Sequence, residues 1–267
     1  MQKTIFITGT STGLGKATAK LFQSNGWKVI ATMRNPEKET ELSQLKSVIL
    51  LPLDVTNVEQ IDSTVKQALA TGDIDVVFNN AGYGLIGPME ALTDQQIVRQ
   101  FETNVFGTLR VTQAFIPYFR ERGKGLFITT TSIGGLIAFP FGSIYHATKW
   151  ALEGWSESVA FELNQFGILV KTVSPGGIKT DFISRSLDTS SHDAYAASLQ
   201  KLYAGFNEDY FTPADQIAQV VYEAATDGKD KLRYVAGADA VALYEQRLKI
   251  GDEAFRRQMG QTFLGNV

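Results

Sequence analysis

Three side chains of this sequence have the types and the spacing that proton transfer needs. Tyr145 and Lys149 stand four residues apart, which on a helix puts both on one face with Cβ atoms roughly 5 to 6 Å apart. A free phenol titrates near about pH 10, and a neighbouring cation favours the phenolate, so Tyr145 could exchange protons closer to neutral pH. Ser132, at the end of an apolar run upstream of Tyr145, adds a hydroxyl. The pair alone would also fit a surface ring packed on a lysine stem, so its meaning depends on the surrounding elements.

A glycine-rich turn near the N-terminus is the first of those elements. The run Thr4–Thr8 predicts a strand, and the stretch that begins at Lys16 has the pattern of a helix. Between them, Gly9 would permit a tight turn, while Gly13 and Gly15 would remove Cβ atoms where a pyrophosphate approaches backbone amides at a helix N-terminus. This order of strand, glycine turn and helix is typical of a dinucleotide-binding fold.

Two other motifs resemble this turn, and both fit it poorly. A nucleotide triphosphatase P-loop needs four residues between its first glycine and Gly-Lys, whereas five separate Gly9 from Gly15. It also needs a hydroxyl ligand for magnesium, where this chain has Ala17. A hydrolase nucleophile elbow centred on Ser11 would have no preceding strand for its oxyanion loop, and the chain holds only two histidines as candidate bases. No metal site is expected.

Strand-like and helix-like stretches alternate along the chain, which indicates a parallel sheet. The strand-like runs centre near Ile5, Val29, Val48, Val76, Phe127, Val170 and Tyr234. In such sheets ligands bind beyond the carboxyl ends of the strands, where the strand order reverses. Gly9, Asp54, Asn79, Ser132 and Pro175 each fall at or just after a predicted strand end, so one crevice is expected to collect them.

Composition favours a single globular domain. The 267 residues are 44% hydrophobic and contain no linker-like or repeated stretch, so we expect one domain over residues 1–267. A formal charge of −3 provides no basic field, so neither nucleic acid nor a membrane is expected as a partner. No apolar run approaches the roughly 20 residues of a membrane span, and no signal peptide is expected before the first strand. With zero cysteines there is no disulfide or thiol site, and we expect a cytoplasmic protein.

These features together make the chain resemble the short-chain dehydrogenase/reductase family. The resemblance runs from Thr4 to about Tyr234 and rests on the Thr8–Gly15 turn, Asn79–Gly82, Asn104, the set of Ser132, Tyr145 and Lys149, and Pro175–Thr180. It implies a Rossmann-type α/β domain, that is, a doubly wound parallel sheet of about seven strands with helices on both faces. It also implies hydride transfer between a nicotinamide cofactor and a carbonyl group or secondary alcohol.

The resemblance assigns the cofactor-binding residues by position. They are Gly9, Ser11, Thr12, Gly13, Leu14 and Gly15 at the pyrophosphate, Asp54 and Val55 beside the adenine, Asn80, Ala81 and Gly82 beside the adenine ribose, and Pro175, Gly176, Ile178 and Thr180 near the nicotinamide, together with Tyr145 and Lys149. Two of these have another explanation, since Asp54 also fits the N-cap region of a helix and Asn80 also fits a turn.

The end of the second predicted strand decides between NADP(H) and NAD(H). An NAD-specific fold usually places an acid there to bind the ribose 2′-hydroxyl, and Thr32 takes that place in this sequence. Arg34, two residues later, could bind a 2′-phosphate through its planar set of donors, and Ser11 could add a hydroxyl. NADP(H) is therefore the preferred cofactor. NAD(H) is the alternative if Arg34 is only a solvated loop charge.

By the same resemblance, Tyr145 is the general acid and base, and Ser132 holds the substrate oxygen. Lys149 lowers the pKa of Tyr145 and binds the nicotinamide ribose, while Asn104 bends its helix and carries a water chain from Lys149 to solvent. Three other functions share part of this pattern: an NAD-dependent alcohol dehydrogenase, a catalytically silent dinucleotide sensor, and an epimerase or dehydratase. The complete catalytic set disfavours the sensor, and the absence of a larger substrate domain disfavours the last.

Two further segments are expected to shape the substrate site and the assembly. Residues 181–211 correspond to the family's substrate-covering segment, although an amphipathic helix packed on the body is the alternative. Its apolar members are Phe182, Ile183, Leu187, Tyr195, Leu199, Leu202, Tyr203, Phe206, Tyr210 and Phe211. They imply a small apolar carbonyl or alcohol substrate. Residues 238–267 would form a helical extension with a break at Gly251, and the resemblance implies a homodimer or homotetramer through the helices around 104–120 and 145–166.

Overall fold

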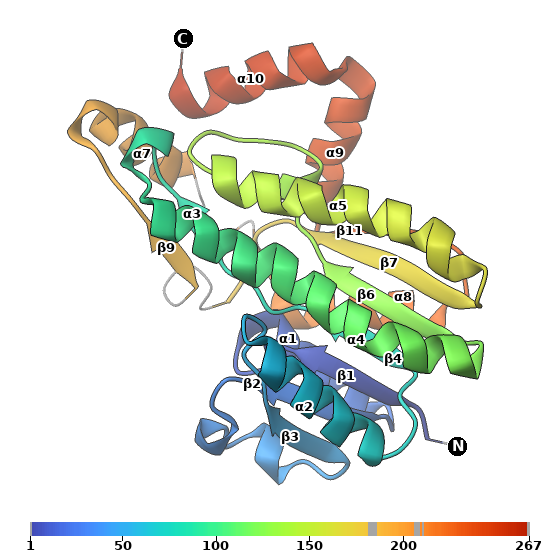
Figure 1. Ribbon diagram of the computed structural model, residues 1–267. Coiled ribbons are helices and arrows are strands. Elements are labelled where there is room, and N and C mark those ends of the chain that lie inside the picture. Colours follow the sequence, from blue (N-terminus) through green and yellow to red (C-terminus); the bar gives the residue numbers. More distant parts are fainter. Residues whose placement is uncertain (1, 181–185, 206–208, 210, 266–267) are drawn as a thin grey trace.

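The computed structural model describes residues 2–180, 186–205, 209 and 211–265, which form one α/β unit around a twisted parallel sheet (Figure 1). The strands of this sheet are β1 (Thr4–Thr8), β2 (Lys28–Met33), β3 (Val48–Pro52), β4 (Val76–Asn79), β6 (Gly125–Thr130), β7 (Ile168–Pro175) and β11 (Arg233–Ala236). They stand in the order β11-β7-β6-β4-β1-β2-β3, and every neighbouring pair is parallel. The predicted fold class and the seven strand positions are confirmed.

Helices cover both faces of the sheet. The α-helices are α1 (Gly13–Ser24), α2 (Val58–Ala70), α3 (Asp94–Phe101), α4 (Gly107–Arg122), α5 (Ser143–Asn164), α7 (Ala196–Gly205), α8 (Ala214–Thr226), α9 (Ala238–Ile250) and α10 (Asp252–Leu264). Helices α1 and α8 pack on one face, and α2, α4 and α5 pack on the other. The strand order reverses beside β1, which pairs with β2 on one side and β4 on the other. A ligand crevice is expected at that point.

Short elements connect the longer ones. They are the 3₁₀ helices η1 (Pro36–Lys38), η2 (Leu42–Gln44), η3 (Met89–Ala91), η5 (Ile133–Gly135) and η6 (Asp193–Tyr195), the π-helical turn η4 (Glu102–Phe106), and the short strands β5 (Gly84–Ile86), β8 (Ile178–Lys179), β9 (Leu187–Thr189) and β10 (Thr212–Pro213).

Strand β1 shows why the sheet is buried on both sides. Its side chains alternate between the faces, as a period of two requires. Ile5 and Ile7 pack in the layer that contains α1 and α8, while Phe6 packs in the layer of α2, α4 and α5, and all three are fully buried. A continuous apolar run is therefore the sequence pattern of a central strand covered by helices on both faces.

The C-terminal extension forms the two helices α9 and α10, and Gly251 separates them at the predicted break with a φ of +80°. Helix α10 buries Phe255 and Met259 against Ile133 and Ile137, which follow Ser132 in the chain. Figure 1 shows α10 lying across the end of the molecule above α5 and close to α7. The extension therefore covers the segment that carries Ser132.

Only part of the expected substrate-covering segment can be described. Phe182, Ile183, Phe206 and Tyr210 lie outside the described residues. Of the remainder, β9 pairs in parallel with β5, which ties this segment to the body of the domain. Leu199 and Leu202 of α7 are buried, whereas Tyr203 is exposed. Among the described helices, none has both the length and the apolar character that crossing a membrane requires.

Candidate active site

A groove of about 970 Å³ runs along the carboxyl edge of the sheet at the reversal of strand order. Of the predicted cofactor-binding residues, it is lined by Gly9, Ser11, Arg34, Asp54, Val55, Asn80, Ala81 and Gly82. These residues come from the ends of β1, β2, β3 and β4. The structure thus brings together groups that are far apart in the chain. For example, Ala81 N donates to Thr8 Oγ1, 73 residues away, at 3.0 Å.

The turn between β1 and α1 presents unpaired backbone amides to this edge. Helix α1 begins at Gly13, and Thr12 occupies the N-cap position without a side-chain bond to the helix. The first N–H groups of an α-helix have no partner inside the helix and lie at the positive end of its dipole, which suits an anion. Leu14 is buried in the core, so only its backbone could serve a phosphate.

Two glycines of the turn are required by close packing. Gly9 has a φ of +71°, and a Cβ there would lie 2.8 Å from Ala81 Cα. A Cβ on Gly15 would lie 2.2 Å from the carbonyl oxygen of Gly9 and 2.6 Å from Asn80 Nδ2. The expectation that Gly15 exposes its amide by lacking a Cβ is therefore wrong in its reason. Gly15 lets the helix pack directly beneath the turn.

Asn80 and Asp54 serve the backbone as well as the groove. Asn80 Nδ2 donates to the carbonyl oxygens of Thr8 and Gly9, each at 3.1 Å, and so holds the turn against β4. Asp54 Oδ1 accepts from Thr56 N at 2.9 Å and Thr56 Oγ1 at 2.7 Å. Asn80 therefore has the turn role that the sequence left open. Asp54 binds Thr56 just before α2, whose N-cap is Asn57, and both Asp54 and Asn80 also line the groove.

The specificity position differs from the sequence-based assignment by one residue. Strand β2 continues to Met33, and Thr32 is fully buried with its hydroxyl donating to the Ile7 carbonyl oxygen at 3.0 Å. Thr32 therefore cannot face a ribose, because its hydroxyl points into the sheet. Met33 and Arg34 line the groove instead, and Ser11 lines it with them. Arg34 is exposed and, within the described part of the chain, forms no hydrogen bond or ion pair.

The predicted catalytic trio is brought together by β6, η5 and α5. Lys149 Nζ donates to the Thr130 carbonyl oxygen at 2.9 Å and lies 5.8 Å from the centre of the Tyr145 ring. Ser132 caps η5 in an extended conformation, with its Oγ accepting from Gly134 N at 3.0 Å. The Ser132 side chain also forms a hydrogen bond with Tyr145. A hydroxyl pair suited to binding one oxygen atom results.

Burial controls the protonation of this trio. Burial raises the pKa of Tyr145 above its usual value of 10.0, and the hydrogen bond with Ser132 offsets only part of that rise. Burial likewise lowers the pKa of Lys149 to about 8, although the negative charge of Glu153 acts in the opposite direction. The net shift of the Tyr145 pKa is therefore upward, opposite to the expected direction, and loss of hydration is its largest cause. The Lys149 ammonium is directed at the Thr130 carbonyl oxygen.

Asn104 joins the catalytic trio to the groove. It lies in the π-helical turn η4 between α3 and α4, in agreement with the predicted bend. Its Nδ2 donates to the Tyr83 carbonyl oxygen at 3.0 Å and to Thr148 Oγ1 at 3.2 Å, and its Oδ1 accepts from Tyr83 N at 3.1 Å. A Cβ on Gly82 would lie 3.1 Å from Asn104 Oδ1 and 3.9 Å from Lys149 Nζ. Gly82 therefore borders both the groove and the catalytic residues.

The predicted nicotinamide segment follows β7 outside the groove residues named above. Pro175 ends β7, and Gly176 N donates to the Ala236 carbonyl oxygen at 3.0 Å. Ile178 lies in β8, which pairs with β10. Thr180 lies opposite the phosphate turn, since its Cγ2 is 3.7 Å from the place a Cβ on Gly13 would take. The segment thus borders the same helix N-terminus.

Three residues near the site were not identified from the sequence as part of it. Asp239 Oδ2 accepts from Gly177 N at 2.8 Å, and Glu153 is a buried carboxylate on the Lys149 helix. His146 is buried, with Nδ1 bonded to the Gly134 carbonyl oxygen at 2.8 Å and Nε2 accepting from Phe139 N at 3.3 Å. Burial also lowers the pKa of His146, which keeps the ring neutral. The position of Glu153, one helical turn beyond Lys149, was the only signal available from the sequence.

Comparison with known proteins agrees with this arrangement. The pattern of the short chain dehydrogenase family matches residues 3–190. An uncharacterised oxidoreductase of Schizosaccharomyces pombe is 40% identical over 239 residues, which cover 85% of this chain and 100% of that protein. The crystal structure of a short-chain dehydrogenase from Streptomyces avermitilis has a TM-score of 0.84 at 32% identity, covering 98% of this chain and 96% of the other. A short chain dehydrogenase from Burkholderia cenocepacia in complex with NADP has a TM-score of 0.79 at 26% identity, covering 97% and 99%.

Proposed function

The chain belongs to the short-chain dehydrogenase family of oxidoreductases, and we propose that it transfers a hydride between NADP(H) and the carbonyl or secondary alcohol of a small apolar substrate. One observation carries the proposal: Ser132, Tyr145 and Lys149 converge beside Gly82, where the groove meets the catalytic residues. A protein that only sensed dinucleotides would not need a half-buried tyrosine bonded to a serine at this place.

The residues of the groove fit the cofactor. The amides at the start of α1 suit a pyrophosphate, and the close approach of Gly9 to Ala81 leaves the turn without side chains. Exposed Arg34, beside Ser11, offers a planar cation for a 2′-phosphate. The relative from Burkholderia cenocepacia was crystallised with NADP, which supports the same preference here. When bound, the nicotinamide would supply or accept the hydride.

The raised pKa of Tyr145 keeps its phenol protonated at neutral pH, so a proton is present for transfer. In carbonyl reduction, Tyr145 would give its proton to the substrate oxygen while the Ser132 hydroxyl holds that oxygen in place. Lys149, with a pKa of about 8, would still be charged at neutral pH and would favour the phenolate that remains. In alcohol oxidation the same groups would act in reverse.

Aromatic side chains near the trio support an apolar substrate. Phe139 and Phe141 lie in the segment between Ser132 and Tyr145, and Phe141 packs edge-on against Tyr195 of η6 at a ring-centre distance of 6.0 Å. This contact joins the catalytic segment to the described part of the substrate-covering segment. Such a cover would exclude water and select substrates by shape.

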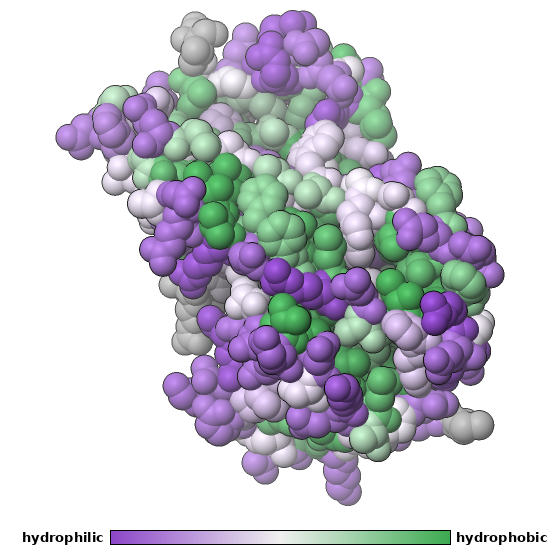
Figure 2. Space-filling model, in the orientation of Figure 1, coloured by the Kyte–Doolittle hydropathy of each residue, from purple (hydrophilic) through white to green (hydrophobic). Residues whose placement is uncertain are grey.

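A homo-oligomer through α4 and α5 fits the exposed surface. Figure 2 shows green apolar patches on the face formed by these helices. Phe161 of α5 is 77% exposed, and Phe106, Trp150 and Phe166 are also exposed. Exposed aromatic side chains gathered on one face are typical of a protein contact.

Replacement of Tyr145 by Phe tests the function. A panel of ketones, aldehydes, steroids and secondary alcohols would be screened for a change in NADPH absorbance. Tyr145→Phe should lower kcat by about 10²- to 10⁴-fold because the proton donor is lost, with NADPH affinity nearly unchanged. Tyr222→Phe, on α8 across the sheet, is the matched control and should keep full activity. Wild-type-like turnover by Tyr145→Phe would exclude the role of Tyr145.

A further inference from the structure

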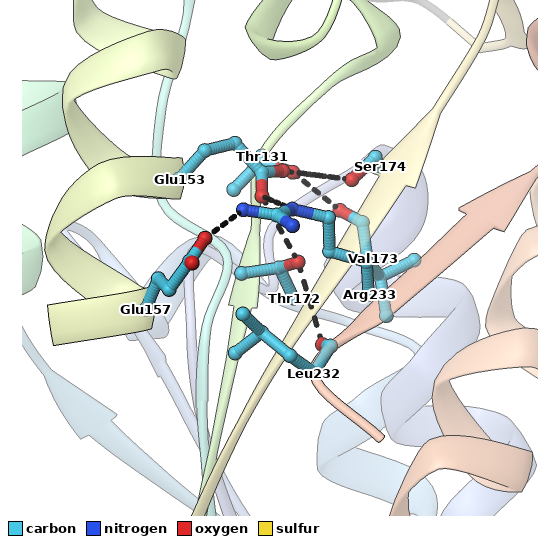
Figure 3. Close-up of polar contacts among 8 residues, drawn as sticks. All are labelled: Thr131, Glu153, Glu157, Thr172, Val173, Ser174, Leu232 and Arg233. Atoms are coloured by element: carbon cyan, nitrogen blue, oxygen red, sulfur yellow. Dashed lines mark hydrogen bonds and ion pairs between the residues drawn. The ribbon is translucent and has the colours of Figure 1, made fainter. Parts of the chain in front are cut away.

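A second polar cluster lies directly behind the catalytic trio, and Glu153 of α5 is at its centre (Figure 3). The Glu153 side chain is only 5% exposed, and both of its carboxylate oxygens have partners. Oε1 accepts from Thr131 Oγ1 at 2.6 Å and from Ser174 Oγ at 2.9 Å. Oε2 accepts from Arg233 Nε at 2.9 Å and from Thr172 Oγ1 at 3.4 Å. A buried carboxylate with this many donors is held firmly in one position.

The partners of Glu153 are the immediate neighbours of site residues. Thr131 stands between Thr130, whose carbonyl oxygen accepts from Lys149 Nζ, and Ser132. Ser174 precedes Pro175 at the end of β7, and the Thr131 and Ser174 hydroxyl oxygens lie 2.8 Å apart. The Glu153 carboxylate, on the same helix as Tyr145 and Lys149, thus binds α5 to the carboxyl ends of β6 and β7.

The turn after Ser132 also packs on this part of α5. A Cβ on Gly135 would lie 2.9 Å from the Lys149 carbonyl oxygen and 3.1 Å from Glu153 Cγ. The contact therefore needs glycine, and it places η5 against the same stretch of helix that supplies Lys149. Strand ends, turn and helix meet around a single side chain.

We propose that Glu153 is a positioning residue that sets the distance of Ser132 and of the Thr130 carbonyl from Tyr145 and Lys149 by bonding α5 to the ends of β6 and β7. This proposal rests on the proposed function for its kinetic consequences. Among the described residues, the following charged or titratable groups face Lys149 and Glu153. Lys149 faces Tyr145 and Glu153, and Glu153 faces Lys149 and Arg233, which in turn pairs with Glu157 at 2.5 Å.

Glu153→Gln and its matched control Glu157→Gln separate this role from general stability. Both changes remove one negative charge from a carboxylate bonded to Arg233, and they lie one helical turn apart on α5, but the Glu157 side chain is 52% exposed. With acetophenone and NADPH as the kinetic probe, Glu153→Gln should lower kcat by about tenfold or more while KM for NADPH stays nearly constant. Glu157→Gln should match the wild type. Equal kcat in the two variants would overturn the proposal.

A second measurement needs no turnover. The Cε resonances of ¹³C-labelled lysine, assigned with Lys149→Met, report the titration of Lys149 in the nucleotide-free protein. Because the negative charge of Glu153 raises the pKa of Lys149, Glu153→Gln should move the Lys149 titration to lower pH, and Glu157→Gln should not. An unmoved titration in Glu153→Gln would show that the Glu153 carboxylate does not lie beside Lys149, and so contradicts the placement on which the proposal stands even if acetophenone is no substrate. A wild type that turns over no carbonyl at all contradicts only the proposed function.

Thr131→Val keeps the test open if Glu153→Gln does not fold. This change removes one hydroxyl bonded to Glu153 and leaves every charge in place. It should lower kcat by about threefold or more without moving the Lys149 titration, because only the position of the strand end changes. Wild-type kinetics for Thr131→Val would overturn the positioning role.

Discussion

Replacing Lys149 by Met should make the nucleotide-free protein more stable, although it removes a catalytic group. Lys149 is only 6% exposed, and its pKa is about 8 instead of 10.5. At about 1.4 kcal/mol per pKa unit, charging the buried amine costs about 3 kcal/mol. Met has a similar shape and avoids that cost, but it loses the hydrogen bond to the Thr130 carbonyl, which contributes about 1 kcal/mol. The expected net gain at pH 7 is about 2 kcal/mol.

The pH dependence of this gain gives the sharper test. Between pH 8 and 10.5, the unfolded chain holds a proton on Lys149 that the folded protein has released, so the wild type gains stability as the pH rises. The advantage of Lys149→Met should therefore shrink above pH 8 and disappear near about pH 10. Urea unfolding of both proteins at several pH values measures it. A variant that is less stable at pH 7, or a difference that stays flat with pH, would refute the reasoning.

Lys16→Met is the control, because its expected change in stability has the opposite sign to that of Lys149→Met. Burial lowers the pKa of Lys16, but the hydrogen bonds with Glu41 and Glu39 outweigh it and raise the pKa above 10.5. Stability from Lys16 is therefore fully present below pH 10.5 and is lost only as the pH rises through the folded value. Lys16→Met should be less stable than the wild type across the range in which Lys149→Met is more stable.

Two further predictions concern cofactor and assembly. Arg34→Ala should weaken NADPH binding by about 10- to 100-fold and leave NADH binding nearly unchanged, measured by fluorescence titration, because only NADPH carries a phosphate for the guanidinium; equal losses would remove the assignment. Phe161→Asp should lower the mass found by light scattering, because a charge would then sit on the exposed face of α5, while Leu248→Asp, at another exposed apolar site on α9, should leave the mass unchanged. A wild-type mass for Phe161→Asp would place the contact elsewhere.

The sequence predicted most of the fold because its signals are local. A central strand such as β1 is an apolar run of five residues, and the glycine turn and the spacing of Tyr145 and Lys149 each lie within one short segment. The right-handed βαβ connection then brings the strand ends to one edge without further information. The convergence of Gly9, Asp54, Asn79, Ser132 and Pro175 on that edge could be predicted for this reason.

The errors arose where one residue of register or one tertiary contact decides a role. Thr32 is predicted to stand at the strand end where an NAD-specific fold has its acid, but the strand is one residue longer, and alternate residues of a strand face opposite sides. Gly15 is predicted to lack a Cβ for the sake of an approaching phosphate, but a Cβ there would meet Gly9 and Asn80. The pKa of Tyr145 was expected to fall, but burial, which no local pattern measures, raises it.

The amino-acid order alone determined the kind of chemistry, since it supplies the serine, tyrosine and lysine together with a turn that suits a dinucleotide. Only the tertiary structure decided how those groups are held and charged. Glu153 and Arg233 are 80 residues apart in the chain, and the Lys149 ammonium is bound to the carbonyl oxygen of Thr130 at the end of β6. Packing sets both hydration and distance, and these two quantities control proton affinity at the site.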